Sequence, residues 1–104
     1  MRNGLYSNAA NAAAILSAMG NTKRLLILCT LTEKEMPVGA LAEKLGLSQS
    51  ALSQHLSKLR ALNLVNTRRD AQTIYYSSSS THVKSLLSTL ESLYPSGSLL
   101  KHIA

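Results

Sequence analysis

The chain contains a single cysteine, Cys29, among its 104 residues. One cysteine cannot form an intrachain disulfide, and it excludes zinc sites built from paired cysteines. The sequence also lacks a glycine-rich phosphate loop, and its serines have no base and orienting acid in a recognisable catalytic arrangement. We therefore expect neither an enzyme nor a bound cofactor, and no catalytic residue is predicted.

Long apolar runs are also missing. No segment approaches the roughly 20 residues that a membrane-spanning helix needs. The alanine-rich start of the chain is interrupted by Asn8 and Asn11, and no basic region leads into a long apolar run, so it makes a poor signal peptide. These features predict a cytoplasmic protein with no membrane partner.

Acidic residues are scarce, with five Asp and Glu against eleven Lys and Arg and a formal net charge of +6. Between Lys44 and Arg69 there is no acid at all, and the basic residues there are Lys44, Lys58, Arg60, Arg68 and Arg69. Such a one-sided basic segment indicates a polyanionic partner, of which nucleic acid is the commonest. The length and the 45% hydrophobic content predict one domain, residues 1–104, with a small core.

The first part of the chain shows helical patterns separated by short breaks. Residues 8–19 are helical by composition and end at Gly20-Asn21, after which Thr22 is expected to cap a second helix. Residues 32–37 read as a polar connection, and residues 1–7 and 95–104 as loose ends. The predicted helices of this part are 8–19, 23–31 and 38–45.

Only Gly46-Leu47-Ser48 separates the helix over 38–45 from the next one, which runs to about residue 62. Two short helices joined by such a turn are typical of a helix-turn-helix, here residues 38–62. One arc of the second helix carries Leu52, Leu56, Leu59 and Leu62. The other arc has no acid and carries Gln49, Ser50, Ser53, Gln54, Ser57 and Arg60. Amides and hydroxyls without acids suit hydrogen bonds to base edges and phosphates in a major groove better than an ordinary solvated surface.

After the fourth helix the pattern changes to β-branched and aromatic residues. Residues 64–68 and 73–77 predict two strands, with residues 69–72 forming a short basic tip. This hairpin over 64–77 is a wing. Tyr75 and Tyr76 must point to opposite faces of their strand, one towards the core or an interface.

A last helix is predicted over 82–93, capped by Thr81, with an apolar stripe along one side. A winged core does not need two further apolar helices at the ends of the chain. We therefore expect helices 8–19 and 82–93 to pack together and to bury a partner copy, although they could instead thicken the monomer core. The predicted dimer residues are Ala12, Leu16, Met19, Val83, Leu86, Leu87, Leu90 and Leu93.

This order of elements, mainly helical with a small hairpin, together with SQSALSQHLSKLR and TRRDAQTIYYS, resembles the ArsR/SmtB family of winged helix-turn-helix repressors. The resemblance covers residues 12–94. It implies a homodimer that binds an inverted-repeat operator in double-stranded DNA and represses by occluding promoters. Two-fold symmetry would set the two recognition helices about one DNA turn apart, roughly 34 Å. Carried onto this sequence, the base-reading positions of the family are Gln49, Ser50, Ser53 and Gln54.

Other residues are expected to hold the DNA backbone. Arg68 and Arg69 would grip phosphate or enter a narrow minor groove, and Lys58 and Arg60 would neutralise phosphates. Ser48 is an N-cap first and a phosphate contact second. The full predicted set is Ser48, Ser57, Lys58, Arg60, Thr67, Arg68, Arg69 and Gln72.

The resemblance also raises the question of a sensed signal. In the family that this chain resembles, one metal site lies on the third helix and needs clustered cysteines, which residues 40–45 lack. A second site lies on the last helix and needs another histidine besides His82. Glu91 and His102 are poorly placed to substitute, so no metal is predicted.

Cys29 and His55 are the other two candidates for a special role. Cys29 matches one cysteine of the redox-responsive branch, but its partner is replaced near Pro95. A buried small hydrophobe is expected, with a redox- or sulfur-responsive repressor that uses Cys29 as the alternative. His55 lies among leucines on the helical projection, so a structural histidine is favoured over a base reader. A winged-helix module that binds an acidic protein is a further alternative.

Overall fold

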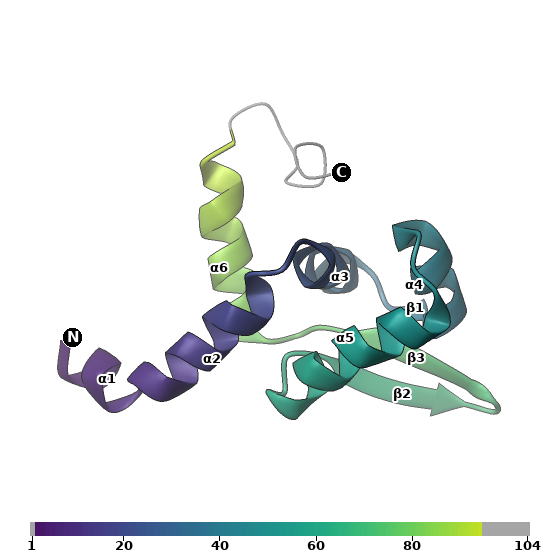
Figure 1. Ribbon diagram of the computed structural model, residues 1–104, viewed down its shortest axis with the longest axis horizontal. Helices are drawn as coiled ribbons and strands as arrows, with labels where there is room; N and C mark the ends of the chain where they lie inside the picture. The colour runs from purple at the N-terminus through teal and green to yellow at the C-terminus, as the bar shows by residue number, and fades with distance from the viewer. Residues whose placement is uncertain (1, 95–104) are drawn as a thin grey trace.

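The chain folds into a helix-turn-helix followed by a hairpin and a final helix (Figure 1). The computed structural model describes residues 2–94. The elements are α1 (Arg2–Ser7), α2 (Ala9–Met19), α3 (Thr22–Glu33), β1 (Met36–Pro37), α4 (Val38–Leu45), α5 (Gln49–Ala61), β2 (Asn66–Asp70), β3 (Thr73–Ser77) and α6 (Thr81–Ser92). The predicted class, a mainly helical winged helix-turn-helix with a small sheet, is confirmed.

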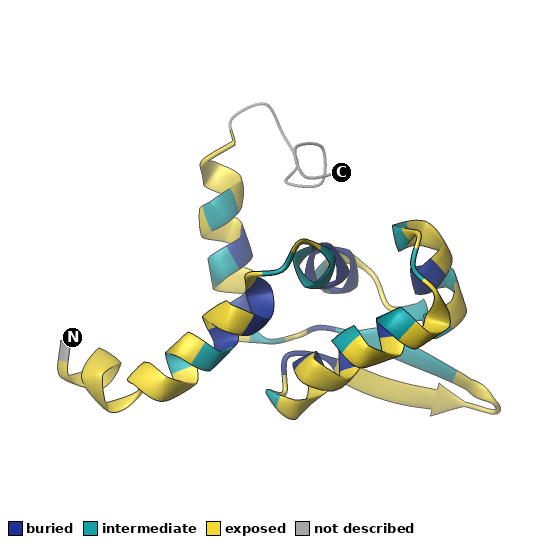
Figure 2. Ribbon diagram, viewed as in Figure 1, coloured by how far each residue is buried: buried dark blue, intermediate teal, exposed yellow. Residues whose placement is uncertain are grey.

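The core is centred on α3, which contacts α2, α4, α5, α6 and β3. Ile27 and Leu28 of α3 are fully buried, and so are Leu52 and Leu59 of α5. Burying a side chain of this size contributes about 1.5–3 kcal/mol relative to leaving it exposed. Buried residues concentrate where the helices and the sheet meet, while α1 and the outer sides of α5 and β2 are exposed (Figure 2). The outer side of α5 is therefore not used by the core.

The sheet has three antiparallel strands in the order β1-β3-β2. β1 pairs with β3 through Met36 opposite Tyr76 and Pro37 opposite Tyr75. We expected residues 32–37 to form only a polar connection, but residues 32–33 continue α3 and residues 36–37 form β1, so only residues 34 and 35 connect the two elements. Two residues are too few to show an alternating pattern, and proline is tolerated in a strand at the edge of a sheet.

Two of the predicted helix caps are displaced by one residue. The side chain of Asn21, not Thr22, accepts a hydrogen bond from the backbone N–H of Arg24 at 3.0 Å. Likewise Ser80, not Thr81, accepts from the backbone N–H of Val83 at 3.3 Å. In both pairs the true cap has an extended backbone, and its neighbour already belongs to the helix.

The start of the chain is also more regular than expected. Residues 2–7 form α1 rather than a loose end. The Ser7 hydroxyl donates to the carbonyl of Asn3 at 3.0 Å, and the Asn8 side chain donates to the carbonyl of Gly4 at 2.8 Å. These bonds satisfy carbonyls at the end of a short helix that lies outside the core. Met1 and the tail expected over 95–104 lie outside the described residues.

Among residues 2–94, no single helix is long and apolar enough to cross a membrane. Joined together, α2 and α3 reach the required length and composition, but the chain bends by 94° between them. The apolar side chains of α3 from Leu26 to Leu31 are buried in the core of the protein.

Candidate nucleic-acid interface

The turn between α4 and α5 is fixed by backbone geometry at Gly46. Gly46 has a φ of 65°, in the left-handed region, and Leu47 donates its backbone N–H to the carbonyl of Ala42 at 2.9 Å. This is the usual way to end a helix at a glycine. The Lys23 ammonium adds a bond to the carbonyl of Leu45 at 3.0 Å. The angle between α4 and α5 is therefore set by local bonds as well as by packing.

α5 presents two faces, as its sequence predicts. Ser48 caps the helix by accepting from the backbone N–H of Ala51 at 3.1 Å, and Leu52, Leu56 and Leu59 are buried. The four predicted base-reading residues are all exposed on the other side: Gln49, Ser50, Ser53 and Gln54. Within residues 2–94, none of their side chains makes a hydrogen bond to protein. Their donors and acceptors are thus available to a partner.

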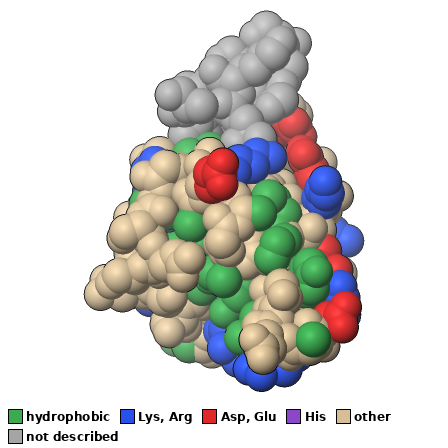
Figure 3. Space-filling model, turned by 90° about the vertical axis from the view of Figure 1, so that its right-hand side faces the viewer, with side chains coloured by type: hydrophobic (Ala, Val, Ile, Leu, Met, Phe, Trp, Pro, Cys, Tyr) green, Lys and Arg blue, Asp and Glu red, His purple; other side chains and the backbone are tan. Residues whose placement is uncertain are grey.

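Positive charge accompanies this face. Lys58 and Arg60 are exposed in the last turn of α5, and the helix contains no acid. Basic residues there also complement the negative end of the helix dipole. Figure 3 looks onto the side that carries α4 and the wing tip, and Lys and Arg side chains gather along its lower edge. An anionic surface placed against α5 would meet cations and no carboxylate from that helix.

His55 is set apart from the exposed polar residues of α5. It is half-buried, and its Nδ1 lies 3.4 Å from Nη1 of Arg24. Burial lowers the pKa of His55, and the nearby charges of Arg24, Lys58 and Lys23 lower it further. The structure thus agrees with a packed, structural histidine.

The wing ends at residue 77 as predicted, and its second strand is β3 over 73–77, but its first strand and its tip differ from the prediction. Leu64 and Val65 are buried, and the first strand of the hairpin is β2 over 66–70 instead of 64–68. The tip is reduced from residues 69–72 to Ala71-Gln72, with Ala71 at a φ of 56°. Because Leu64 and Val65 pack into the core, the strand begins two residues later than predicted. Thr67, Arg69 and Gln72 are exposed in this wing.

The two wing arginines have different surroundings. The Arg68 guanidinium donates to Glu35 through Nη2 at 2.8 Å and through Nε at 3.1 Å, and it lies 4.4 Å from the centre of the Tyr75 ring. The hydrogen bond from Arg68 lowers the pKa of the Glu35 carboxyl. The Arg69 side chain makes no hydrogen bond or ion pair within residues 2–94. The sequence predicted the same role for both arginines, but the structure leaves only Arg69 unpaired.

Three residues that support this surface were missed by sequence reasoning. Glu35 holds Arg68, Lys23 bonds to the end of α4, and Arg24 donates to the carbonyl of Ala18 at 2.6 Å at the end of α2. Each contact joins segments that are distant in the sequence or separated by a bend. No local spacing could have identified them.

The predicted dimer residues divide into two groups. Met19, Val83 and Leu87 are buried within the subunit and leave little surface exposed, although Met19 also lines a hollow on this side. The remaining five form what we call the α2–α6 apolar face: Ala12, Leu16, Leu86, Leu90 and Leu93. Leu16 is 57% exposed and Leu93 65% exposed.

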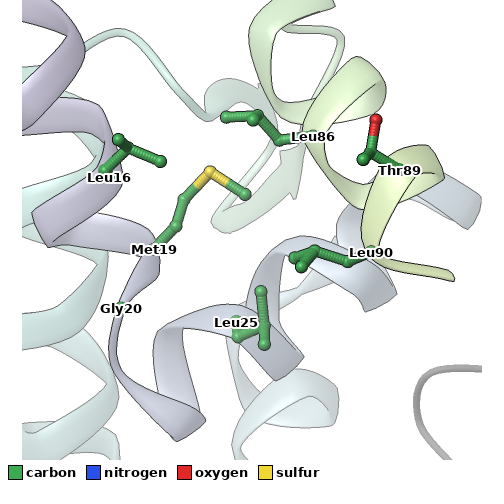
Figure 4. Close-up of a pocket in the computed structure, with 7 residues that line it drawn as sticks. All are labelled: Leu16, Met19, Gly20, Leu25, Leu86, Thr89 and Leu90. Atoms are coloured by element: carbon green, nitrogen blue, oxygen red, sulfur yellow. The ribbon is translucent and has the colours of Figure 1, made fainter. Parts of the chain in front are cut away.

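A hollow of about 310 Å³ lies on this side of the molecule (Figure 4). It is lined by Leu16, Met19, Gly20, Leu25, Leu86, Thr89 and Leu90. The side chains of Leu16 and Met19 come from α2, and those of Leu86 and Leu90 come from α6 (Figure 4). The hollow is thus an apolar surface between α2 and α6, with Leu25 of α3 also lining it.

Metal and redox chemistry find little support in the described part of the chain. No group of three or more His, Cys, Asp or Glu side chains comes together among residues 2–94, and His102 lies outside that range. Cys29 is 7% exposed, and burial raises its pKa to about 11, with Glu33 and Glu91 contributing. Cys29 is therefore the buried small residue that the sequence predicted.

Comparison with known proteins agrees with this architecture. Residues 21–67 match the bacterial regulatory protein, arsR family. The nodulation protein NolR of Rhizobium meliloti is 67% identical over 89 residues, which cover 86% of this chain and 73% of that protein. The transcriptional activator HlyU of Vibrio cholerae is 54% identical over 90 residues, covering 86% of this chain and 83% of HlyU. These relatives are named for gene regulation or nodulation rather than for an enzymatic reaction.

A solved structure of a relative has the same fold. NolR from Sinorhizobium fredii superposes with a TM-score of 0.82 at 67% identity, covering 86% of this chain and 89% of that one. The helix-turn-helix and wing segments quoted above also look like NolR, and the identity over most of both chains confirms that resemblance. The chain belongs to the ArsR family of DNA-binding transcriptional regulators.

Proposed function

We propose that this protein is a homodimeric repressor that binds an inverted-repeat operator in double-stranded DNA. The exposed face of α5 carries the proposal. Gln49, Ser50, Ser53 and Gln54 are exposed, and their side chains have no hydrogen-bond partner among the described residues. Their helix also carries cations and no acid. A glutamine amide can make paired hydrogen bonds to adenine, and serine hydroxyls can serve several base edges.

The α2–α6 apolar face supports the dimer. Leu16 and Leu93 are large apolar side chains that the subunit leaves exposed, and the hollow beside Leu16 is lined almost entirely by apolar residues. In a dimer with two-fold symmetry, the same patch on each copy would cover the other. Such symmetry would present two α5 helices to successive major grooves.

We further propose that the regulated genes are symbiosis or nodulation genes and that the protein acts in the cytoplasm. The support is the 67% identity to a protein named for nodulation. HlyU is named as an activator, so the sign of regulation must be measured directly. A repressor that occludes promoters predicts lower transcription when the protein is added to a purified transcription reaction.

Sensing through Cys29 is the second candidate function, and the structure does not favour it. The raised pKa leaves little thiolate at neutral pH, and the thiolate is the reactive form. Without a signal, operator occupancy would follow the amount of protein.

The test is selection of bound duplexes from fragmented genomic DNA, followed by footprinting and by measurement of the mass of the complex. We expect an inverted repeat, two protected half-sites about one turn apart, and two protein copies per duplex. The salt dependence of binding should be steep, because several phosphates are neutralised. A folded protein that ignores duplexes, or binds an acidic protein instead, would overturn the proposal.

A further inference from the structure

The outer face of the wing carries a three-residue arrangement formed by Glu35, Tyr75 and Arg68. The three come from the segment before β1, from β3 and from β2, so the contact crosses the whole sheet. Arg68 donates two hydrogen bonds to Glu35, at 2.8 and 3.1 Å, while its guanidinium lies over the Tyr75 ring. A two-point bond to a carboxylate fixes the direction of a guanidinium as well as its position.

The strand register determines which way each wing arginine points. Arg68 is opposite Tyr75, and Thr67 is opposite Tyr76. Directly opposed residues share a face, and successive residues alternate. Tyr76 packs against the hydrophobic core, so Thr67 and Arg69 lie on the helix side of the sheet, whereas Arg68 lies on the side away from it. A hairpin cannot present both arginines to one surface without a bulge.

We propose that Glu35 is a positioning residue that holds Arg68 across the outer face of the wing and keeps its charge away from the DNA backbone. Arg69 is then the wing cation that contacts phosphate. This inference rests on the proposed DNA-binding function. Its consequence is that Glu35 limits sequence-independent affinity, because each additional cation on the backbone strengthens binding to every sequence alike.

The exposure of the pair is consistent with a positioning role and not with a large contribution to folding. The Arg68 side chain is 52% exposed and that of Glu35 37% exposed. Ion pairs at such positions contribute little to stability. Replacing Glu35 should therefore leave the fold intact while it frees a long basic side chain at the exposed edge of the hairpin.

The test measures how the affinity for a random duplex depends on salt concentration. In B-DNA, each neutralised phosphate adds about 0.9 to the slope of log affinity against log salt. We expect Glu35→Gln to steepen the slope by up to about 0.9. Arg68→Ala should leave the slope of the native protein unchanged, and Arg69→Ala should reduce it by about 0.9.

A double variant separates the two ways in which Glu35 could act. If Glu35 works by holding Arg68, Glu35→Gln combined with Arg68→Ala returns to the native slope. Retention of the steeper slope in the double variant would show that the Glu35 charge alone opposes DNA, and it would overturn the proposal. A reduced slope for Arg68→Ala alone would also overturn it, because Arg68 would then contact phosphate directly.

The failure of this inference can be told apart from the failure of the proposed function. If the native protein binds no duplex, the DNA-binding function fails. If it binds with a steep salt dependence but the slopes of the variants do not follow the pattern above, only the role of Glu35 fails. Thermal unfolding by circular dichroism shows whether each variant remains folded.

Discussion

The guanidinium of Arg24 joins the end of α2 to the side of α5 through His55. Its Nε donates to the carbonyl of Ala18 at 2.6 Å, and its Nη1 lies 3.4 Å from His55 Nδ1. A guanidinium can only donate, so Nδ1 must be the acceptor, which requires a neutral imidazole. The packing of α5, the proposed DNA-reading helix, against the end of α2 therefore depends on the protonation state of His55.

This arrangement predicts a pH dependence of stability. The pKa of His55 is lowered in the folded protein, chiefly by burial, so protonation favours the unfolded chain. The contribution of neutral His55 to the free energy of unfolding is fully present above the usual histidine pKa of about 6.5. It is lost as the pH falls through the lower pKa that His55 has in the folded protein. Between pH 7.5 and 5, the free energy of unfolding should decrease more in the native protein than in His55→Gln.

Urea denaturation at a series of pH values measures this difference. Glutamine keeps an acceptor for Arg24 but does not titrate. His82 is exposed at the start of α6, outside the contact between Arg24 and His55, so His82→Gln is the matched control for the removal of an imidazole. If His55→Gln follows the native curve over the whole range, the assignment to His55 is wrong.

The turn of the helix-turn-helix offers a test of backbone conformation. Gly46 has a φ of 65°, and a Cβ placed there would meet nothing within 4 Å. The cost of Gly46→Ala is therefore conformational, about 1 kcal/mol, and should appear as a lower free energy of unfolding. Gly39 is equally unobstructed but lies inside α4 with no positive φ, so Gly39→Ala should stabilise by roughly 0.5 kcal/mol. If Gly46→Ala and Gly39→Ala both raise or both lower the free energy of unfolding, backbone conformation at Gly46 is not the cause of the change.

The fold was largely predictable because its signals are local. The apolar spacing in α4 and α5, the turn at Gly46 and the cap at Ser48 each lie within a few residues of one another. The exposed face of α5 follows from the same helical periodicity.

The remaining features depend on contacts between distant segments. β1 exists because Met36 and Pro37 pair with β3, nearly forty residues later in the sequence. The sequence shows Arg68 and Arg69 as one basic pair, and only the sheet register separates them. An apolar stripe also does not reveal whether it packs within the subunit or between subunits. Met19, Val83 and Leu87 are buried within the subunit, and their contact with a partner copy stays a prediction.

Cys29 should react slowly while the protein is folded. Its pKa rises from 9.0 to about 11, which lowers the thiolate fraction at pH 8 roughly 100-fold, and burial restricts access further. Alkylation by iodoacetamide should therefore be at least about 100-fold slower in buffer than in denaturing urea. Cys29→Ser should show the same DNA binding as the native protein after treatment with sulfide or peroxide. Equal alkylation rates in buffer and in urea, or release of DNA that depends on Cys29, would favour the redox alternative.

Gln54 and Arg69 separate sequence choice from general affinity for DNA. Gln54 is exposed on α5 and Arg69 on β2, and neither side chain has a hydrogen-bond partner within residues 2–94. Gln54→Ala should weaken binding to the selected operator by roughly 1–3 kcal/mol and leave binding to a random duplex nearly unchanged. Arg69→Ala should weaken both by a similar factor and reduce the salt slope by about 0.9.

Lys84 provides the control for a lost positive charge. It is exposed on α6, and Figure 1 shows α6 rising away from α5 and the hairpin. Lys84→Ala therefore changes the net charge as Arg69→Ala does, but on a different element. Its salt slope should stay at the native value, because counterions are released only where a cation meets phosphate. Titrations of operator and random duplex at several salt concentrations measure all three variants. If Gln54→Ala and Arg69→Ala change the two affinities in the same ratio, α5 is not the element that reads the bases.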